Sequence, residues 1–213
     1  MNYPQTRLTD ISFVAFDTET TGLFPIMHLL VEIGAVHFPL DGRELATFQQ
    51  LIEPHIPIPS DVQHVHGITD RMVQGKPTTE HVLPRFVEFL GAADTIRLAH
   101  NAPFDLGFLA MALTRLGIAF PPHYVFDTLD MACRLYPTWP SHSLEHVAGR
   151  LKVANGAEHR AFPDARIVKD VFLELLRRIP TVKNLLIWFI ARRCSPLPMP
   201  QSSLLSHRQA LRR

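Results

Sequence analysis

The sequence predicts an α/β domain in which helices flank a mixed β-sheet. Strand-like apolar segments come first, at 11–17, 30–38 and 44–52, and beyond residue 96 such segments alternate with helical ones. The chain has 213 residues, of which 46% are hydrophobic and 19% charged, so it can bury a substantial core. The composition excludes a generally disordered chain, and no internal repeat is visible.

The first half of the chain is expected to hold three strands and one helix. The second strand reads LVEIGAVHF (30–38), and a proline-punctuated loop follows the third at 54–61. Residues 79–90 have apolar side chains at helical spacing, and Pro84 predicts a break inside that helix.

The second half alternates strands with helices. Strands are expected at 96–100 and 124–128, and helices at 104–117, from 128 through 135, at 144–151 and at 164–178. Gly117 closes the first of these helices, and Ser143 is placed to cap the third.

The composition changes near residue 178, which predicts a folded domain over 1–178 and a basic, proline-containing tail over 179–213. From residue 175 onward the chain has eight basic residues and no acidic one, whereas residues 1–174 carry 13 basic and 20 acidic side chains. A polyanionic substrate would therefore need cations to bind the acidic body. The tail would add unspecific affinity for a phosphate backbone.

The sequence favours a cytoplasmic protein. Residues 1–10 lack an apolar signal region, and the longest apolar run, 185–191, is far shorter than the roughly 20 residues of a membrane-spanning helix. Cys133 and Cys194 are the only cysteines, which excludes a disulfide framework and fits a reducing compartment.

Two acidic residues end the first predicted strand, in the stretch FVAFDTETTGL (13–23). Side chains alternate along a strand, so Asp17 and Glu19 share one face and lie next to each other. Like charges at a partly dry position repel and raise each other's pKa. A positively charged partner is therefore expected at this strand end.

Three further polar residues lie in the first turn of a predicted helix or just before one. Asp105 and Asp164 each fall in the first turn of a predicted helix, where a carboxylate complements the helix dipole. His159 lies five residues before Asp164, in the connecting segment. Taken singly, each of the three has an ordinary structural explanation.

The order of these segments resembles the DEDD exonuclease family, and more narrowly its DnaQ-like, histidine-containing branch, which includes the proofreading subunit of bacterial DNA polymerase III. The resemblance is carried by FDTETTGL (16–23), VEIGAV (31–36), HGIT (66–69), HNAPFDLGFL (100–109), SLEHVAGRL (143–151) and HRAFPDA (159–165). These segments span about 11–176 in the family's order.

The resemblance implies a ribonuclease-H-like fold that gathers the acidic side chains into one metal site. Asp17, Glu19, Asp105 and Asp164 would hold two divalent ions, Mg²⁺ or Mn²⁺. His159 would be the general base. The implied activity is two-metal 3′–5′ exonucleolytic hydrolysis of DNA to nucleoside 5′-monophosphates, in proofreading or repair, with RNA as the alternative substrate.

The resemblance also implies substrate contacts from Thr18, Thr20, Leu23, His66, Asn101 and Phe104. Backbone N–H groups around the two threonines would hold the terminal 3′-hydroxyl, the leucine would wedge against the last base, and the phenylalanine would stack or pack on a nucleotide. Core packing is the alternative for the leucine and the phenylalanine, and a structural role in the HGIT turn is the alternative for the histidine.

Two residues near these motifs need a separate prediction. Asp127 is expected to cap a helix and not to bind metal. Pro163 departs from the helix-forming residues that are usual in the family, and we expect it in the first helical turn, with Asp164 in place and activity retained.

Other interpretations stay open. The stretch HSLEH (142–146) matches an inverted zinc-peptidase pattern, with His142 and His146 as ligands and Glu145 as base. A nuclease-like module that only binds nucleic acid is a second alternative. In the tail, QSSLL (201–205) partly resembles the pentapeptide by which bacterial replication proteins bind the sliding clamp, so a clamp or a DNA polymerase is a candidate partner.

Overall fold

The computed structural model describes residues 12–91, 95–119, 125–153 and 159–179. They contain a five-stranded mixed sheet. Its strands are β1 (Ser12–Thr20), β2 (Leu30–Pro39), β3 (Ala46–Leu51), β4 (Ile96–Ala99) and β5 (Val125–Asp127), in the order β3-β2-β1-β4-β5. The β1–β2 and β2–β3 pairs are antiparallel, and the β1–β4 and β4–β5 pairs are parallel. The predicted α/β class with a mixed sheet is confirmed.

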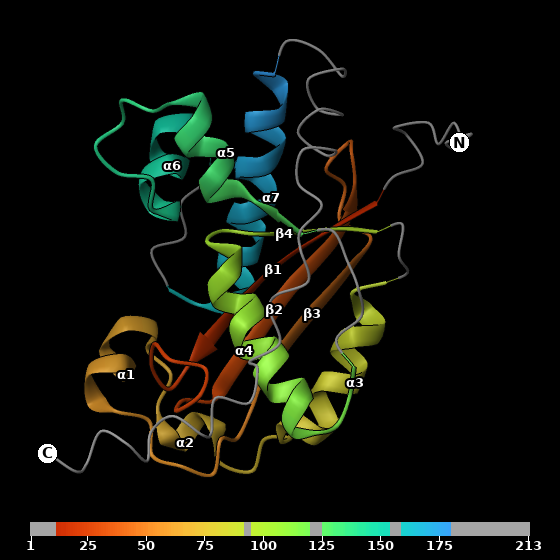
Figure 1. Cartoon of the computed structure of the whole chain (residues 1–213), viewed down its shortest axis with the longest axis vertical. Coiled ribbons are helices and arrows are strands. Elements are labelled where there is room, and N and C mark those ends of the chain that lie inside the picture. Colours follow the sequence, from red (N-terminus) through yellow and green to blue (C-terminus); the bar gives the residue numbers. More distant parts are fainter. Residues whose placement is uncertain (1–11, 92–94, 120–124, 154–158, 180–213) are drawn as a thin grey trace, which may run out of the picture. The chain divides into compact units, whose positions relative to one another are not determined.

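Helices cover both faces of this sheet (Figure 1). In the described part of the chain they are α1 (Ser60–His66), α2 (Asp70–Val73), α3 (Thr79–Phe89), α4 (Ala102–Arg115), α5 (Thr128–Leu135), α6 (Leu144–Leu151) and α7 (Ala161–Arg177). Helices α3 and α4 lie on one face and α7 lies on the other, where α5 and α6 pack against it.

The two faces of β1 pack against different helices. Phe16 contacts Phe86 of α3 edge-on, with ring centroids 6.1 Å apart, whereas Phe13 packs on Phe172 of α7 at 5.1 Å. Residues 13, 15, 17 and 19 share one face because side chains alternate along a strand. The acidic pair of β1 therefore points to the side of the sheet that carries α7.

The strand β1 extends well beyond its parallel neighbour. In the described register, β4 pairs with β1 only from Phe13 to Ala15, while β2 follows β1 as far as Thr20. The acidic end of β1 thus has a strand on one side and the start of α4 on the other.

The local structure differs from the expectations at α1, α2 and α3. The two short helices α1 and α2 were not expected, and α1 begins at Ser60, inside the predicted loop 54–61. Neither has a side-chain hydrogen bond at its N-cap, so the usual start signal is missing. The predicted break at Pro84 is wrong, because α3 runs through it. Pro84 is exposed, so water can bind the carbonyl that proline leaves without an amide partner.

The last helix in the described ranges, α7, begins at Ala161, three residues earlier than expected, and Pro163 is its third residue. The first four N–H groups of a helix have no partner within it, so a proline at this position loses no helical hydrogen bond. The N–H of Asp164 donates to the carbonyl of Arg160 at 3.0 Å. The expected first-turn position of Pro163 is confirmed.

The predicted tail, 179–213, lies outside the described residues apart from Ile179, and so does its QSSLL stretch. The domain boundary near residue 178 therefore stays a prediction. Within the described ranges, none of the helices has both the length and the apolar composition that crossing a membrane requires.

Candidate active site

Acidic side chains from β1 and α7 meet at one end of the sheet. Asp17, Glu19 and Asp164 each offer one carboxylate oxygen, and the three oxygens lie within 4.8 Å of one another. All three residues are partly buried. The fold thus brings together three of the four carboxylates expected in the metal site; we call them the acidic cluster.

The fourth carboxylate, Asp105, comes from the first turn of α4 and is only 2% exposed. Its Oδ1 accepts a hydrogen bond from the Thr18 hydroxyl at 2.7 Å. This bond joins α4 to the acidic strand. Asp105 therefore lies beside the acidic cluster and is not one of its three mutually close groups.

Burial and repulsion raise the pKa of each of these four carboxyl groups. Desolvation is the largest cause for Asp17, whose pKa lies well above the ordinary range, and the charges of Asp105 and Glu19 raise it further. Burial is likewise the largest cause for the other three, and it raises the pKa of Glu19 to about 8, of Asp105 to about 7 and of Asp164 to about 6. Without a cation, the four groups therefore resist being ionised together.

The donor set fits a hard divalent cation. Carboxylate oxygens are the ligands that Mg²⁺ and Mn²⁺ prefer, and the acidic cluster offers three of them within reach of one another. A bound cation would also offset the repulsion that raises the pKa values. Neither thiolate nor imidazole belongs to the cluster, which disfavours a structural zinc site.

The imidazole of His159 lies near the edge of this cluster. His159 directly precedes Arg160, the N-cap residue of α7, and its side chain is exposed. Burial raises the pKa of Asp164, and the nearby His159 opposes that rise. The exposed ring is therefore open to water beside the carboxylate of Asp164.

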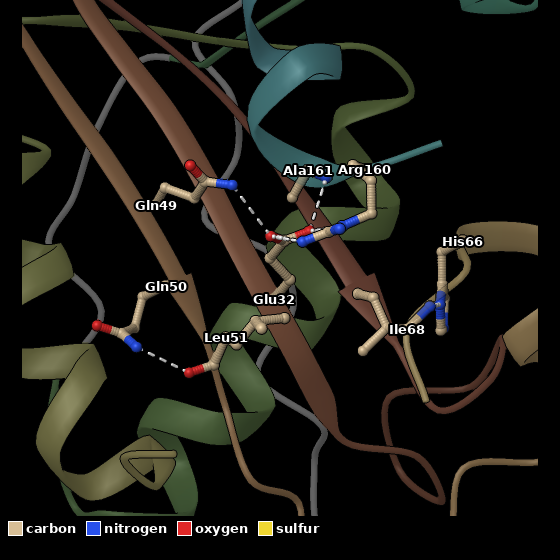
Figure 2. Close-up of polar contacts among 8 residues, drawn as sticks. All are labelled: Glu32, Gln49, Gln50, Leu51, His66, Ile68, Arg160 and Ala161. Carbon is tan, nitrogen blue, oxygen red and sulfur yellow. Dashed lines mark hydrogen bonds and ion pairs between the residues drawn. The ribbon is translucent and has the colours of Figure 1, made fainter. Parts of the chain in front are cut away.

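Two residues for which the sequence predicted no role, Glu32 and Arg160, hold the start of α7 against β2. The carboxylate of Glu32 is fully buried and pairs with the Arg160 guanidinium at 2.7 Å (Figure 2). An acid inside the apolar run LVEIGAV was a usable signal, because a buried charge needs a partner. The partner itself, 128 residues along the chain, has no local signal.

Two predicted substrate residues, Leu23 and Phe104, have accessible apolar surface. Leu23 lies in the loop between β1 and β2 and is 71% exposed, so core packing is wrong for it. Phe104 is half-buried and packs on Phe108 with ring centroids 5.0 Å apart, so it combines a core contact with an accessible part.

Asn101 precedes α4 in a left-handed conformation, with φ of 65°, and its side chain is exposed. Its N–H donates to Oδ1 of Asp127 at 2.9 Å. The same oxygen accepts the N–H of Leu129 at 2.9 Å and caps α5. The prediction that Asp127 is a helix cap is confirmed.

The residues His66 and Thr20 stabilise each other's loops. His66 is 3% exposed, its Nε2 lies 3.3 Å from the Thr20 carbonyl, and its Nδ1 accepts the N–H of Ile68 at 2.9 Å. The Thr20 hydroxyl donates to the Gly22 carbonyl. Both ring nitrogens of His66 have protein partners, which supports its structural role in the HGIT turn.

The zinc-peptidase interpretation of HSLEH is wrong. Helix α6 begins at Leu144, after Ser143, whose hydroxyl accepts the N–H of His146 at 3.4 Å as the expected cap. His142 therefore lies before the helix and does not share a helical face with His146. Its Nε2 is 2.9 Å from the carbonyl of Tyr136.

Known proteins are similar to this chain in sequence over most of the described domain. Residues 14–172 match the family RNase_T, described as Exonuclease. The PolC-type DNA polymerase III of Halalkalibacterium halodurans is 36% identical in an alignment of 171 residues that covers 76% of this chain and 12% of that protein. The PolC-type DNA polymerase III of Caldanaerobacter subterraneus subsp. tengcongensis is 35% identical over 170 residues, 80% of this chain. The chain spans about 12% of the length of these relatives.

Solved structures are similar as well. Exonuclease X, in complex with 5′ overhanging duplex DNA, aligns with a TM-score of 0.62 and 27% identity over 80% of this chain and 93% of that chain. Exonuclease I of E. coli, in complex with a dA16 oligonucleotide, aligns with a TM-score of 0.73 and 19% identity over 83% of this chain and 43% of that chain. At 19% identity the second likeness concerns the fold alone.

Proposed function

Because the chain belongs to the exonuclease family, as a DnaQ-like 3′–5′ exonuclease with the ribonuclease-H-like fold, we propose that it hydrolyses DNA from the 3′ end with divalent metal ions held by its acidic cluster. The observation that carries this proposal is the approach of the Asp17, Glu19 and Asp164 oxygens to within 4.8 Å. All three residues fall inside the matched range 14–172. The products would be nucleoside 5′-monophosphates.

Membership of this family implies a divalent metal ion, and we assign the ligands from the side chains present. Asp17, Glu19 and Asp164 would hold one Mg²⁺ or Mn²⁺ ion, and Asp105 would serve a second ion together with Asp17. When bound, the ions would neutralise the carboxylates and polarise the scissile phosphodiester. The raised pKa values of the four carboxyls support this assignment, because they mark charges that lack a counterion.

We assign His159 as the general base. Its ring would take a proton from the attacking water and release it to solvent, for which an exposed side chain is suited. The position just before α7 keeps the ring near Asp164.

Substrate binding follows from the accessible groups around the cluster. Leu23 would pack against the terminal base, and Phe104 and Asn101 would contact the last nucleotides. The backbone of Thr18 to Thr20 would bind the 3′-hydroxyl, because β4 leaves that edge of β1 without a strand partner in the described register. His66 would act through the HGIT turn.

DNA is the substrate that the relatives favour. Exonuclease X, at 27% identity, was solved with DNA, and the PolC-type relatives are DNA polymerases, which supports a role in proofreading or repair. A 3′–5′ exoribonuclease of the same superfamily is the alternative, because the contacts that recognise a 2′-hydroxyl have no sequence signature in this chain.

The test is digestion of end-labelled single-stranded DNA, single-stranded RNA and mismatched DNA duplex with Mg²⁺ or Mn²⁺. We expect a ladder from 5′-labelled DNA and immediate release of label from 3′-labelled DNA. Asp17→Ala should lower the rate by about 1000-fold or more, and His159→Ala by about 100-fold, in the range for loss of a general base.

Two outcomes would contradict the proposal in different ways. Unchanged activity in the Asp17→Ala preparation would identify a contaminant and favour a module that only binds. Laddering of RNA alone would replace the substrate and leave the mechanism in place.

A further inference from the structure

We propose that Glu32 and Arg160 are positioning residues, whose ion pair fixes the start of α7 on β2 so that His159 and Asp164 face Asp17 and Glu19. This inference rests on the proposed function, because it assigns a task to residues outside the metal ligands and substrate contacts assigned above. Neither residue belongs to the acidic cluster.

The contact between Glu32 and Arg160 is bidentate and directional. The Arg160 Nε donates to Oε2 of Glu32 at 2.8 Å, and Nη2 donates to Oε1 at 2.7 Å. The carboxylate of Glu32 is fully buried, and the arginine side chain is 23% exposed. A guanidinium and a carboxylate joined by two parallel bonds fix orientation as well as distance. The pair therefore sets how the chain enters α7.

Glu32 also supplies the capping hydrogen bond that the N-cap residue of this helix does not make. The N-cap residue of α7, Arg160, makes no side-chain capping bond. Instead Oε2 of Glu32 accepts the N–H of Ala161, the first helical residue, at 3.2 Å. A carboxylate at a helix start binds an otherwise unpaired N–H and complements the helix dipole. One buried side chain on β2 thus holds both the residue before the helix and the first residue in it.

The register of the sheet places this anchor opposite the acidic strand. Glu32 pairs with Glu19 across the β1–β2 ladder, and Gly34 pairs with Asp17. The backbone of Ala161 and Phe162 lies directly on Gly34, where an added Cβ would come within 2.2 Å of backbone atoms. The helix start therefore touches β2 beside the two acids of β1.

The position of the anchor in the chain connects it to the catalytic groups. His159 is the residue before Arg160, and Asp164 follows Arg160 by one helical turn. The Glu32 charge adds to the repulsion in the cluster, since after burial it is among the charges that raise the pKa of Glu19 and of Asp164. Glu32 therefore makes ionisation of the site harder, and yet it binds the start of α7. A positioning role explains why a buried acid stands there.

The competing role for Arg160 is direct contact with a substrate phosphate. Its Nε and Nη2 are engaged by Glu32, which favours positioning. The two roles predict different kinetics. Loss of a phosphate contact raises KM for DNA, whereas misplacement of Asp164 and His159 lowers kcat and weakens metal binding without DNA.

The test uses the full chain with Arg160→Gln and Glu32→Gln, and with Glu44→Gln as the matched control. Glu44 joins the same helix through Arg166 at 2.7 Å and Lys169 at 3.0 Å, so the control also removes ion pairs of α7. For each variant we would measure Mn²⁺ binding by calorimetry without DNA, thermal unfolding, and kcat and KM on single-stranded DNA.

We expect the two anchor variants to lose about 10–100-fold in Mn²⁺ affinity and in kcat, the range seen when groups that orient metal ligands are removed. Their KM should change by less than about threefold. Glu44→Gln should keep Mn²⁺ affinity and kcat within about twofold. Anchor variants that match this control in both quantities would overturn the proposal, and so would a rise in KM alone.

Arg160→Lys keeps the test decisive if the glutamine variants do not fold, because lysine keeps the charge but not the fork. A folded Arg160→Lys with reduced Mn²⁺ affinity supports positioning, and one with wild-type affinity overturns it. An unfolded Arg160→Lys also overturns it, since the pair would then serve stability. Absence of nuclease activity in the wild-type chain would instead refute the proposed function.

Discussion

Each carboxyl group of the site lies in an environment that disfavours its ionised form. Burial is the main cause of the raised pKa of Glu19, about 8, and of Asp105, about 7, against ordinary values of 4.5 and 3.8. At pH values between the ordinary and the raised pKa of each group, the folded, metal-free protein still binds a proton that the unfolded chain has released. Stability of the metal-free protein must therefore fall as the pH rises through this range.

The first prediction is a pH-dependent stabilisation by metal between pH 7.5 and 8.5. Burial lowers the pKa of His37, His66 and His100 below 6.5, so near pH 6.5 the unfolded chain binds more protons at these rings than the folded protein does; this opposing effect is largely over about one pH unit higher. In EDTA the unfolding temperature should fall from pH 7.5 to 8.5, and Mg²⁺ or Mn²⁺ should raise it more at pH 8.5. Differential scanning fluorimetry measures both effects.

The control for this prediction is Asp17→Asn, which removes one of the interacting charges. Its unfolding temperature in EDTA should vary less with pH than that of the wild type, because Glu19 then loses a neighbour that opposes its ionisation. Equal slopes in the two proteins would mean that groups outside the site cause the pH dependence.

Single residues were predictable where a local pattern carried their chemistry. Asp17 and Glu19 stand at the end of an apolar strand, and Asp164 stands in a first helical turn, so each had a signal within a few residues. For Glu32 the sequence indicated a buried acid that needs a partner but not which residue that partner is, and for Arg160 no local pattern indicated a role. What binds these two together is the tertiary approach of α7 to β2, which no short stretch of sequence contains.

At the level of elements, the site depends on how closely α7 approaches β2. Gly34 makes this approach possible, because a Cβ there would meet the backbone of Ala161 and Phe162 at 2.2 Å. Backbone atoms cannot move aside as the end of a flexible side chain can. A side chain at residue 34 must therefore push the helix start, with Asp164, away from β1.

The second prediction concerns Gly34→Ala, which should lower stability by about 1–3 kcal/mol, as overpacking does, and weaken Mn²⁺ binding at the same time. The control is Gly75→Ala, where the added Cβ has open space but φ is +71°, so only backbone strain of roughly 1–2 kcal/mol is expected. Denaturant unfolding and calorimetry separate the two. Gly34→Ala with wild-type Mn²⁺ affinity would contradict the prediction.

The elements that carry the site were predictable because their patterns are long and periodic. The apolar runs of β1 and β2 and the repeating pattern of α7 gave the right type of structure. The helices α1 and α2 span only seven and four residues, too short for a helical period to appear. The start of α7 was placed late, because Pro163 pointed to a first turn without saying which residue of that turn it occupies.

For the molecule as a whole, charge is unevenly divided along the chain. Residues 1–174 carry an excess of acids, whereas the residues from 175 onward include basic residues and no acidic one. The residues that we assign to catalysis all lie in 1–174. We therefore expect the tail to affect binding to partners or to long nucleic acid and not the chemical step.

The third prediction is that deleting 199–213 abolishes retention of the chain by an immobilised sliding clamp and leaves kcat on a short oligonucleotide unchanged. The double substitution Gln201→Ala and Leu204→Ala should have the same effect, because these positions match the clamp-binding pentapeptide. Ser206→Ala, just outside the stretch, is the control. An intact chain that the clamp does not retain would refute docking.

The spread of the four acids along the chain also has a consequence for synthesis. Asp17 is synthesised well before Asp164, which lies in the final described helix, on the same face of the sheet. A nascent polypeptide that ends short of α7 therefore has an incomplete ion cage. We expect such a polypeptide to be inert until α7 has been made and has packed on the sheet.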